Sequence, residues 1–114
     1  MYIHMVSYIQ RYARVYACVL ARRYIDRDSV DIKGKGIIEL TTKYLKIDIN
    51  NSKKIEENIY IMKINCLTNK FKDISVNGKK NLTAKWEDPN GDKLLNDVIS
   101  DSCENVKLVK YLKE

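Results

Sequence analysis

The chain has 114 residues, of which 45% are hydrophobic and 32% are charged, and its formal net charge is +6. This length allows one domain, and this balance is that of a globular protein and excludes a disordered chain. All apolar runs fall well short of the roughly 18 residues that a membrane-spanning helix needs, so we expect no membrane span.

Residues 1–14 form a poorly assigned N-terminal segment, and residues 15–114 form a single domain in our interpretation. Apolar side chains recur at helical spacing in the N-terminal segment, but the segment also has features of a targeting remnant. A secretory signal needs an unbroken apolar centre of about 7–15 residues, and Gln10, Arg11 and Arg14 interrupt this one. The sequence therefore predicts no functional signal peptide, and Cys18 is expected to be a strand residue.

Short β-strands are predicted from residue 15 onwards, because β-branched and aromatic residues gather in brief runs between turn residues. Two glycines favour a turn over Lys33–Gly36, and the dipeptide Asn77-Gly78 is typical of a hairpin turn. The polar stretch Asn50–Lys54 connects two longer runs. The predicted strands are Val15–Leu20, Tyr24–Asp26, Ile37–Ile49, Ile59–Cys66, Phe71–Val76 and Thr83–Glu87.

A helix is predicted after the strands. Its start is placed in Asp88–Asp92, because proline suits a first helical turn and Asp or Asn side chains cap its free amide groups. Cys103 follows Ile99 by four residues, so its sulfur shares the apolar face of the helix. That face consists of Leu94, Leu95, Val98 and Ile99. Residues Val106–Leu112 continue the packing either as a strand or as a further helical turn.

Two of the three cysteines end predicted elements. Cys66 ends a strand and Cys103 lies on the apolar helix face, so a disulfide between them is physically reasonable and suits a small exported domain. Cys18 is then left over. The cysteines lack Cys-x-x-Cys spacing and His4 is the only histidine. We therefore predict no metal site, no cofactor, no Ser-His-Asp triad and no enzyme activity.

Basic residues are scattered along the chain, and we take the connection Asn50–Lys54 with two nearby lysines as the candidate partner surface. The lysines of this surface are Lys43, Lys46, Lys53 and Lys54, and they predict an acidic or sulfated partner. The alternative is a solvated charged face. Aromatic residues do not interleave with the basic ones, so we do not expect nucleic-acid binding. Tyr24 and Asp26 are interpreted as structural residues, and Trp86 as a core residue.

Three sequence blocks stand out, and together they order residues 15–110. They are Arg23–Val30, Met62–Cys66, and Trp86 with Pro89 before the helix to Cys103. In this order they resemble the surface-adhesin protein E family, small exported domains of Gram-negative bacteria. The first block is similar to the family's Tyr-Ile-Asp-x-x-Ser-Ile signature, the second to its strand ending in Asn/Asp-Cys, and the third to its closing Trp, Pro and Cys pattern.

The resemblance implies an α+β fold, with an antiparallel sheet of about six strands and a C-terminal helix packed across it and held by a Cys66–Cys103 disulfide. It also implies a homodimer, and a place in the periplasm or on the cell surface. The family's named member is a lipoprotein adhesin that binds host matrix and serum proteins, so we expect an exported binding module, either a surface adhesin or an envelope protein. The alternatives are an intracellular basic nucleic-acid-binding protein and a periplasmic inhibitor of a cell-wall enzyme. Bridged cysteines favour the exported proteins.

Overall fold

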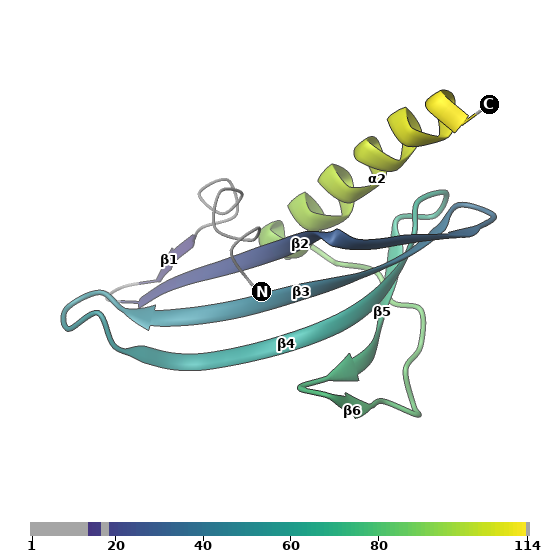
Figure 1. Ribbon diagram of the computed structural model, residues 1–114. Coiled ribbons are helices and arrows are strands. Elements are labelled where there is room, and N and C mark those ends of the chain that lie inside the picture. Colours follow the sequence, from purple (N-terminus) through teal and green to yellow (C-terminus); the bar gives the residue numbers. More distant parts are fainter. Residues whose placement is uncertain (1–13, 17–18, 114) are drawn as a thin grey trace.

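The computed structural model describes the backbone of residues 14–16 and 19–113, and the side chains of residues 19–104. The predictions for residues 1–13 and for Cys18 lie outside these residues. The described residues form an antiparallel sheet and one long helix, which lies against one face of the sheet (Figure 1). The elements are β1 (Arg14–Tyr16), β2 (Val19–Gly34), β3 (Ile37–Asp48), β4 (Lys54–Asn65), β5 (Lys70–Val76), β6 (Lys79–Lys80) and α2 (Lys93–Lys113).

The sheet is a meander in which each strand pairs antiparallel with its neighbour in sequence, in the order β1-β2-β3-β4-β5-β6. β2, β3 and β4 have 16, 12 and 12 residues, whereas β1 and β6 have three and two. The predicted fold class is confirmed: an antiparallel sheet carries a C-terminal helix. The number of full-length strands is smaller than the six or so expected.

The core lies between the sheet and α2. On β3 every second residue from Ile38 to Thr42 is buried, because successive side chains of a strand point to opposite faces. The predicted apolar face of the helix is confirmed as the surface that meets them. The buried apolar residues are Ala21, Ile25, Ile38, Leu40, Met62, Ile64 and Phe71 on the sheet, and Leu94, Leu95, Val98, Ile99 and Cys103 on α2.

A disulfide fixes α2 to the sheet. Cys66, which directly follows β4, is bonded to Cys103 of α2, and their Cα atoms lie 5.5 Å apart. This distance is inside the range of about 4.4–6.8 Å usual for disulfides, so the predicted pairing is confirmed. The two cysteines are 37 residues apart, and closing such a loop contributes about 4 kcal/mol in the chain-entropy account.

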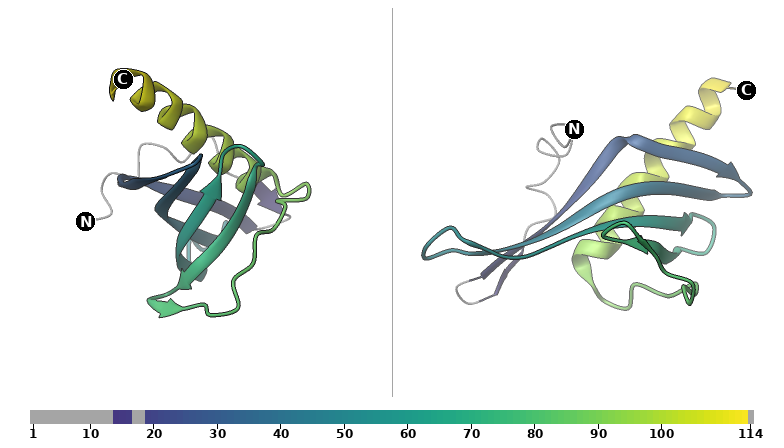
Figure 2. Two further views of the ribbon diagram at one scale, coloured as in Figure 1. Left: turned by 90° about the vertical axis from the view of Figure 1, so that its right-hand side faces the viewer. Right: turned by 60° about the horizontal axis from the view of Figure 1, so that its bottom comes forward.

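The boundaries predicted for the first two strands are wrong, because β2 runs continuously through a wide bulge. Asp26 pairs with Thr41 and Asp31 with Glu39, so residues 27–30 lie opposite Leu40 alone. The extra residues bend β2 sharply (Figure 2).

The helix begins later than predicted, at Lys93. Pro89 O accepts a hydrogen bond from Asp92 N at 2.9 Å, and Asn90 and Gly91 have positive φ angles of 38° and 78°. This turn is incompatible with a helix in Asp88–Asp92. Asp92 is the capping residue, because its Oδ1 accepts a hydrogen bond from Leu95 N at 3.2 Å.

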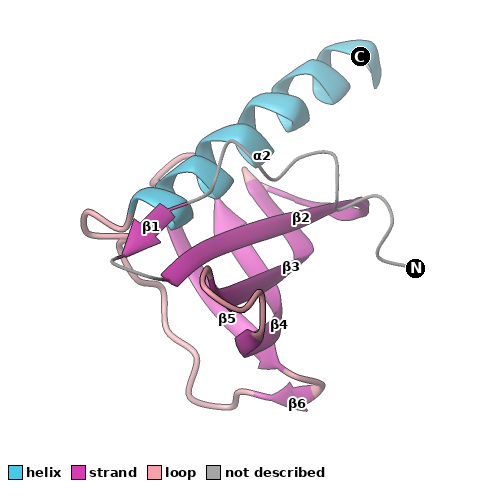
Figure 3. Cartoon of the chain, turned by 90° about the vertical axis from the view of Figure 1, so that its left-hand side faces the viewer, coloured by secondary structure: helices cyan, strands magenta, loops and turns pink. Residues whose placement is uncertain are grey.

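The segment between β6 and α2 is a loop, not the predicted strand Thr83–Glu87 (Figure 3). Glu87 alone pairs with Phe71, through two backbone hydrogen bonds of 2.8 and 3.0 Å. The backbone N of Asn81 still donates to Ile74 O, and the pairing of β6 with β5 ends there. The Asn81 side-chain amide donates to Asp73 O, and its Oδ1 accepts a hydrogen bond from Thr83 N, which closes a local turn. At the other end, Val106–Leu112 is helical, which decides between the two predicted alternatives.

Candidate functional site

The face of the sheet away from α2, called the outer face here, is the larger candidate binding surface. Among the described residues no helix covers it (Figure 2). It carries the alternate residues of the central strands, which are half-buried rather than buried. An open hollow in this face is lined by Thr41, Ile59, Ile61, Ser75, Asn77 and Gly78. The outer face therefore combines apolar and polar contact groups on a regular scaffold.

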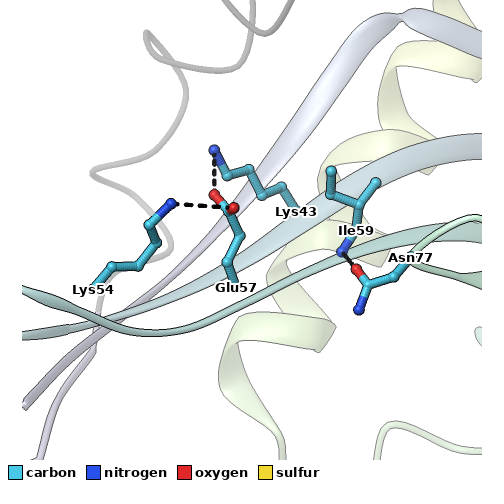
Figure 4. Close-up of polar contacts among 5 residues, drawn as sticks. All are labelled: Lys43, Lys54, Glu57, Ile59 and Asn77. Atoms are coloured by element: carbon cyan, nitrogen blue, oxygen red, sulfur yellow. Dashed lines mark hydrogen bonds and ion pairs between the residues drawn. The ribbon is translucent and has the colours of Figure 1, made fainter.

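Asn77 fixes one rim of this hollow (Figure 4). Its Oδ1 accepts a hydrogen bond from Ile59 N at 2.7 Å, and its backbone N donates to Ile59 O at 2.7 Å. Asn77 has a φ of 51°, a conformation that asparagine tolerates better than most residues. The predicted Asn77-Gly78 hairpin turn is thus confirmed: it connects β5 to β6, and the bonds of Asn77 to Ile59 fasten the end of β5 to β4.

Two of the predicted partner-surface lysines meet at one carboxylate on the outer face (Figure 4). Lys43 Nζ lies 2.9 Å from Glu57 Oε2, and Lys54 Nζ lies 3.2 Å from Glu57 Oε1. Residues three apart in a regular strand point to opposite faces, but the register shift at Ile55 places Lys54 and Glu57 on the same one. The hydrogen bonds from Lys43 and then Lys54 lower the pKa of Glu57.

The other two lysines of that predicted surface lie elsewhere. Lys46 is in register with Ala21 and Glu56, on the face that α2 covers. Lys53 lies exposed in the turn between β3 and β4. The structure therefore places Lys53 and Lys54 at the end of the β3–β4 hairpin and Lys43 further along β3 on the outer face, whereas Lys46 lies on the opposite face.

Asp26 has the structural role predicted for it, in the bulge of β2. Its Oδ1 accepts a hydrogen bond from Asp28 N at 3.1 Å, and its backbone O accepts one from the Ser29 hydroxyl at 2.6 Å. Ser29 Oγ in turn accepts a hydrogen bond from Thr41 N at 2.8 Å. The Tyr-Ile-Asp-x-x-Ser block thus encodes a bulge in which a serine hydroxyl replaces a missing ladder partner.

Trp86 is not a core residue, and the prediction that it is one is wrong. It remains 36% exposed, and Lys72 Nζ lies 4.7 Å from the centre of its ring. Lys72 is also in register with Lys63, and like charges directly opposite each other destabilise a sheet. By strand register, one face of the sheet carries a basic surface made of Lys63, Lys70, Lys72 and Lys80. Lys79 points to the opposite face. Distance along the sequence hid this basic surface, because its lysines come from three different strands.

A polar cleft lies on the inner face, below the start of α2. The Arg23 guanidinium lies 4.9 Å from the centre of the Tyr60 ring. Arg23 Nη1 and Asp73 Oδ1 are buried, and neither has a hydrogen-bond partner among the described residues. Burial raises the pKa of Asp73, Arg23 acts in the opposite direction, and Glu87 raises it further. The cleft is lined by Arg23, Tyr44, Glu56, Tyr60, Asp92 and Leu94.

The described residues hold no group of His, Cys, Asp and Glu side chains arranged to bind a metal ion. Among them there is also no helix that combines the length and hydropathy needed to cross a bilayer.

The described residues thus form a disulfide-bonded antiparallel meander with a helix on one face and an open outer face. Residues 14–109 match the sequence model of the surface adhesin-E family. The chain belongs to this family, as the three sequence blocks suggested. Comparison with curated proteins and with solved structures gave no match.

Proposed function

We propose that this protein is an exported, non-enzymatic adhesin that binds an acidic or sulfated partner through the tip of its β3–β4 hairpin. Membership of the surface adhesin-E family supports the general role. The Cys66–Cys103 disulfide favours export over the intracellular nucleic-acid-binding alternative, because such bonds persist in oxidising compartments. Host matrix and serum proteins are the class of partner that the family resemblance suggests.

The hairpin tip itself is the observation that carries the proposal. It extends beyond the rest of the sheet (Figure 1), and two isoleucines, Ile49 and Ile55, remain 47% and 54% exposed on it. Lys53 and Lys54 lie directly beside them. Exposed aliphatic side chains flanked by cations suit a protein surface of opposite charge, in which apolar contact gives affinity and charge gives orientation and rate.

A matched pair of charge reversals tests this assignment. Lys53→Glu with Lys54→Glu should weaken binding to immobilised heparin, to poly-glutamate or to a matrix protein by at least about tenfold. Binding of the parent should also weaken steeply with salt, because exposed charges are screened within about 8 Å at physiological ionic strength. The melting temperature should hardly change, since exposed ion pairs contribute little stability.

The control is Lys79→Glu with Lys80→Glu, which makes the same charge change on β6, at a different end of the sheet. This control should keep most of the affinity. Equal loss in both double variants would show a response to net charge alone and would contradict a binding surface at the hairpin.

A further inference from the structure

The loop after β6 contains a compact turn that holds an apolar side chain in solvent. Asn81 Oδ1 accepts hydrogen bonds from Thr83 N at 3.3 Å and from the Thr83 hydroxyl at 3.1 Å. The backbone of Asn81 donates to Ile74 O at 3.0 Å and fastens the turn to β5. Leu82 lies at the tip and is 91% exposed, the largest exposure among the apolar side chains described as exposed. A turn that is fixed on both sides holds this leucine out of the core.

Lysines flank this turn: Lys79 and Lys80 of β6 precede it and point to opposite faces of the sheet, and Lys85 follows it. Lys79, Lys80 and Lys85 are exposed, and none of them forms an ion pair or a side-chain hydrogen bond with a described residue. The hairpin tip differs, because there Glu57 contacts both Lys43 and Lys54. The positive charge around Leu82 is therefore less compensated than the charge around Ile55.

Trp86 follows on the same segment. The cation–π contact with Lys72 holds its ring at the surface, partly exposed. Glu87, the next residue, pairs through its backbone with Phe71. Its negative charge raises the pKa of Asp73. The stretch before Glu87 thus carries lysines, one exposed leucine and one indole ring. The acidic residues Glu87 and Asp88 follow it, where the chain turns toward α2.

We propose that this stretch, the lysine-flanked turn (Lys79, Lys80, Leu82, Lys85 and Trp86), docks on an anionic lipid surface. A lipid surface offers each group a suitable environment. Anionic headgroups attract the lysines, the acyl boundary accepts Leu82, and an indole ring is favoured at the level of the headgroups. A sulfated polysaccharide would satisfy the lysines but gives Leu82 no apolar medium.

The lysine-flanked turn and the hairpin tip lie at different ends of the sheet (Figure 1). Lipid docking is therefore independent of the proposed partner binding, and each can be removed by substitutions that leave the other site unchanged.

The test measures binding of the full chain to vesicles of phosphatidylcholine alone and of phosphatidylcholine with phosphatidylglycerol. Co-sedimentation should show binding to the anionic vesicles only. Trp86 is the only tryptophan, so its fluorescence should shift to shorter wavelength as the vesicles bind. Leu82→Ser should weaken binding by at least about tenfold, and Lys79→Glu with Lys80→Glu should reduce it by at least as much.

Two control variants match these changes at the hairpin tip. Ile55→Ser removes another exposed aliphatic side chain, and Lys53→Glu with Lys54→Glu makes the same charge reversal; both should retain vesicle binding. The proposal is overturned if the parent does not bind anionic vesicles or if it binds neutral ones equally. It is also overturned if Leu82→Ser binds like the parent while the lysine variant loses both vesicles and heparin, because the turn would then be a site for polyanions.

Discussion

Asp73 shows, at the scale of a single residue, how burial and charge compete in this protein. Its carboxylate lies partly buried on β5, with Oδ1 lacking a hydrogen-bond partner among the described residues. Loss of hydration disfavours the charged form more than Arg23 favours it, so the pKa of Asp73 lies above its ordinary value of 3.8. The ionised group therefore makes the folded state less stable at neutral pH than a neutral group of the same shape would.

Asp73→Asn should accordingly raise the melting temperature at neutral pH. Because the folded-state pKa is raised, the stability that protonated Asp73 contributes is complete below its unfolded pKa and is lost as pH rises through the folded pKa. The advantage of the asparagine variant should therefore shrink as the solution is acidified and vanish below about pH 3.8. Thermal melts across this pH range measure the effect, with the exposed Asp88→Asn as control. A variant less stable than the parent at pH 7 would mean that attraction to Arg23 dominates.

At the scale of an element, the bulge of β2 depends on one hydroxyl group. Ser29 Oγ accepts a hydrogen bond from the Thr41 backbone amide and donates one to Asp26 O. These two bonds replace the ladder bond that a regular strand would form. Removing it leaves a partly buried amide without its partner, which costs about 1–3 kcal/mol.

Ser29→Ala should therefore lower the melting temperature by several degrees. Ser29→Thr keeps a hydroxyl and should recover much of the loss, whereas Ser100→Ala on the exposed side of α2 should have little effect. If Ser29→Thr were as unstable as Ser29→Ala, the cause would be crowding in the bulge and not the hydrogen bond.

The sequence predicted those elements whose signals are local and periodic. The run of β-branched and aromatic residues between two turns placed β3, and the four-residue spacing between Ile99 and Cys103 put the cysteine on the helix face that meets the sheet. The start of α2 was missed, because Pro89 and Asp88 look like a helix start while the positive φ values of Asn90 and Gly91 become visible only in the structure.

The candidate sites depended on strand register and on bulges, which the periodicity of the sequence does not show. Lys46 and Lys43 lie on opposite faces of the sheet. Lys54 forms an ion pair with Glu57 only because the bulge at Ile55 puts both side chains on the same face. The basic surface beside Trp86 assembles lysines from β4, β5 and β6, so distance along the sequence hid it. Propensity identified the strands, but pairing register decided which charges meet.

At the scale of the whole molecule, the disulfide connects the sheet and α2, the two layers that share the core. Replacing both Cys66 and Cys103 by serine should lower the free energy of unfolding by about 4 kcal/mol if the effect comes from chain entropy. The melting temperature should then fall by more than about 10 °C. The parent in reducing buffer should behave like the double variant, and Cys18→Ser, which leaves the bridge intact, is the control. An unchanged melting temperature in the double variant would show that the core alone holds α2 in place.

The position of that same bond has a consequence for how the protein responds to proteolysis. The exposed residues of the loop after β6, Lys85 included, lie between the two bonded cysteines in sequence. A trypsin-like protease that cuts after Lys85 would therefore divide the chain without releasing either piece, because Cys66 and Cys103 hold the two parts together. The nicked protein should migrate as one species until a reducing agent separates its fragments, so a single cut in this exposed loop need not detach the helix from the sheet.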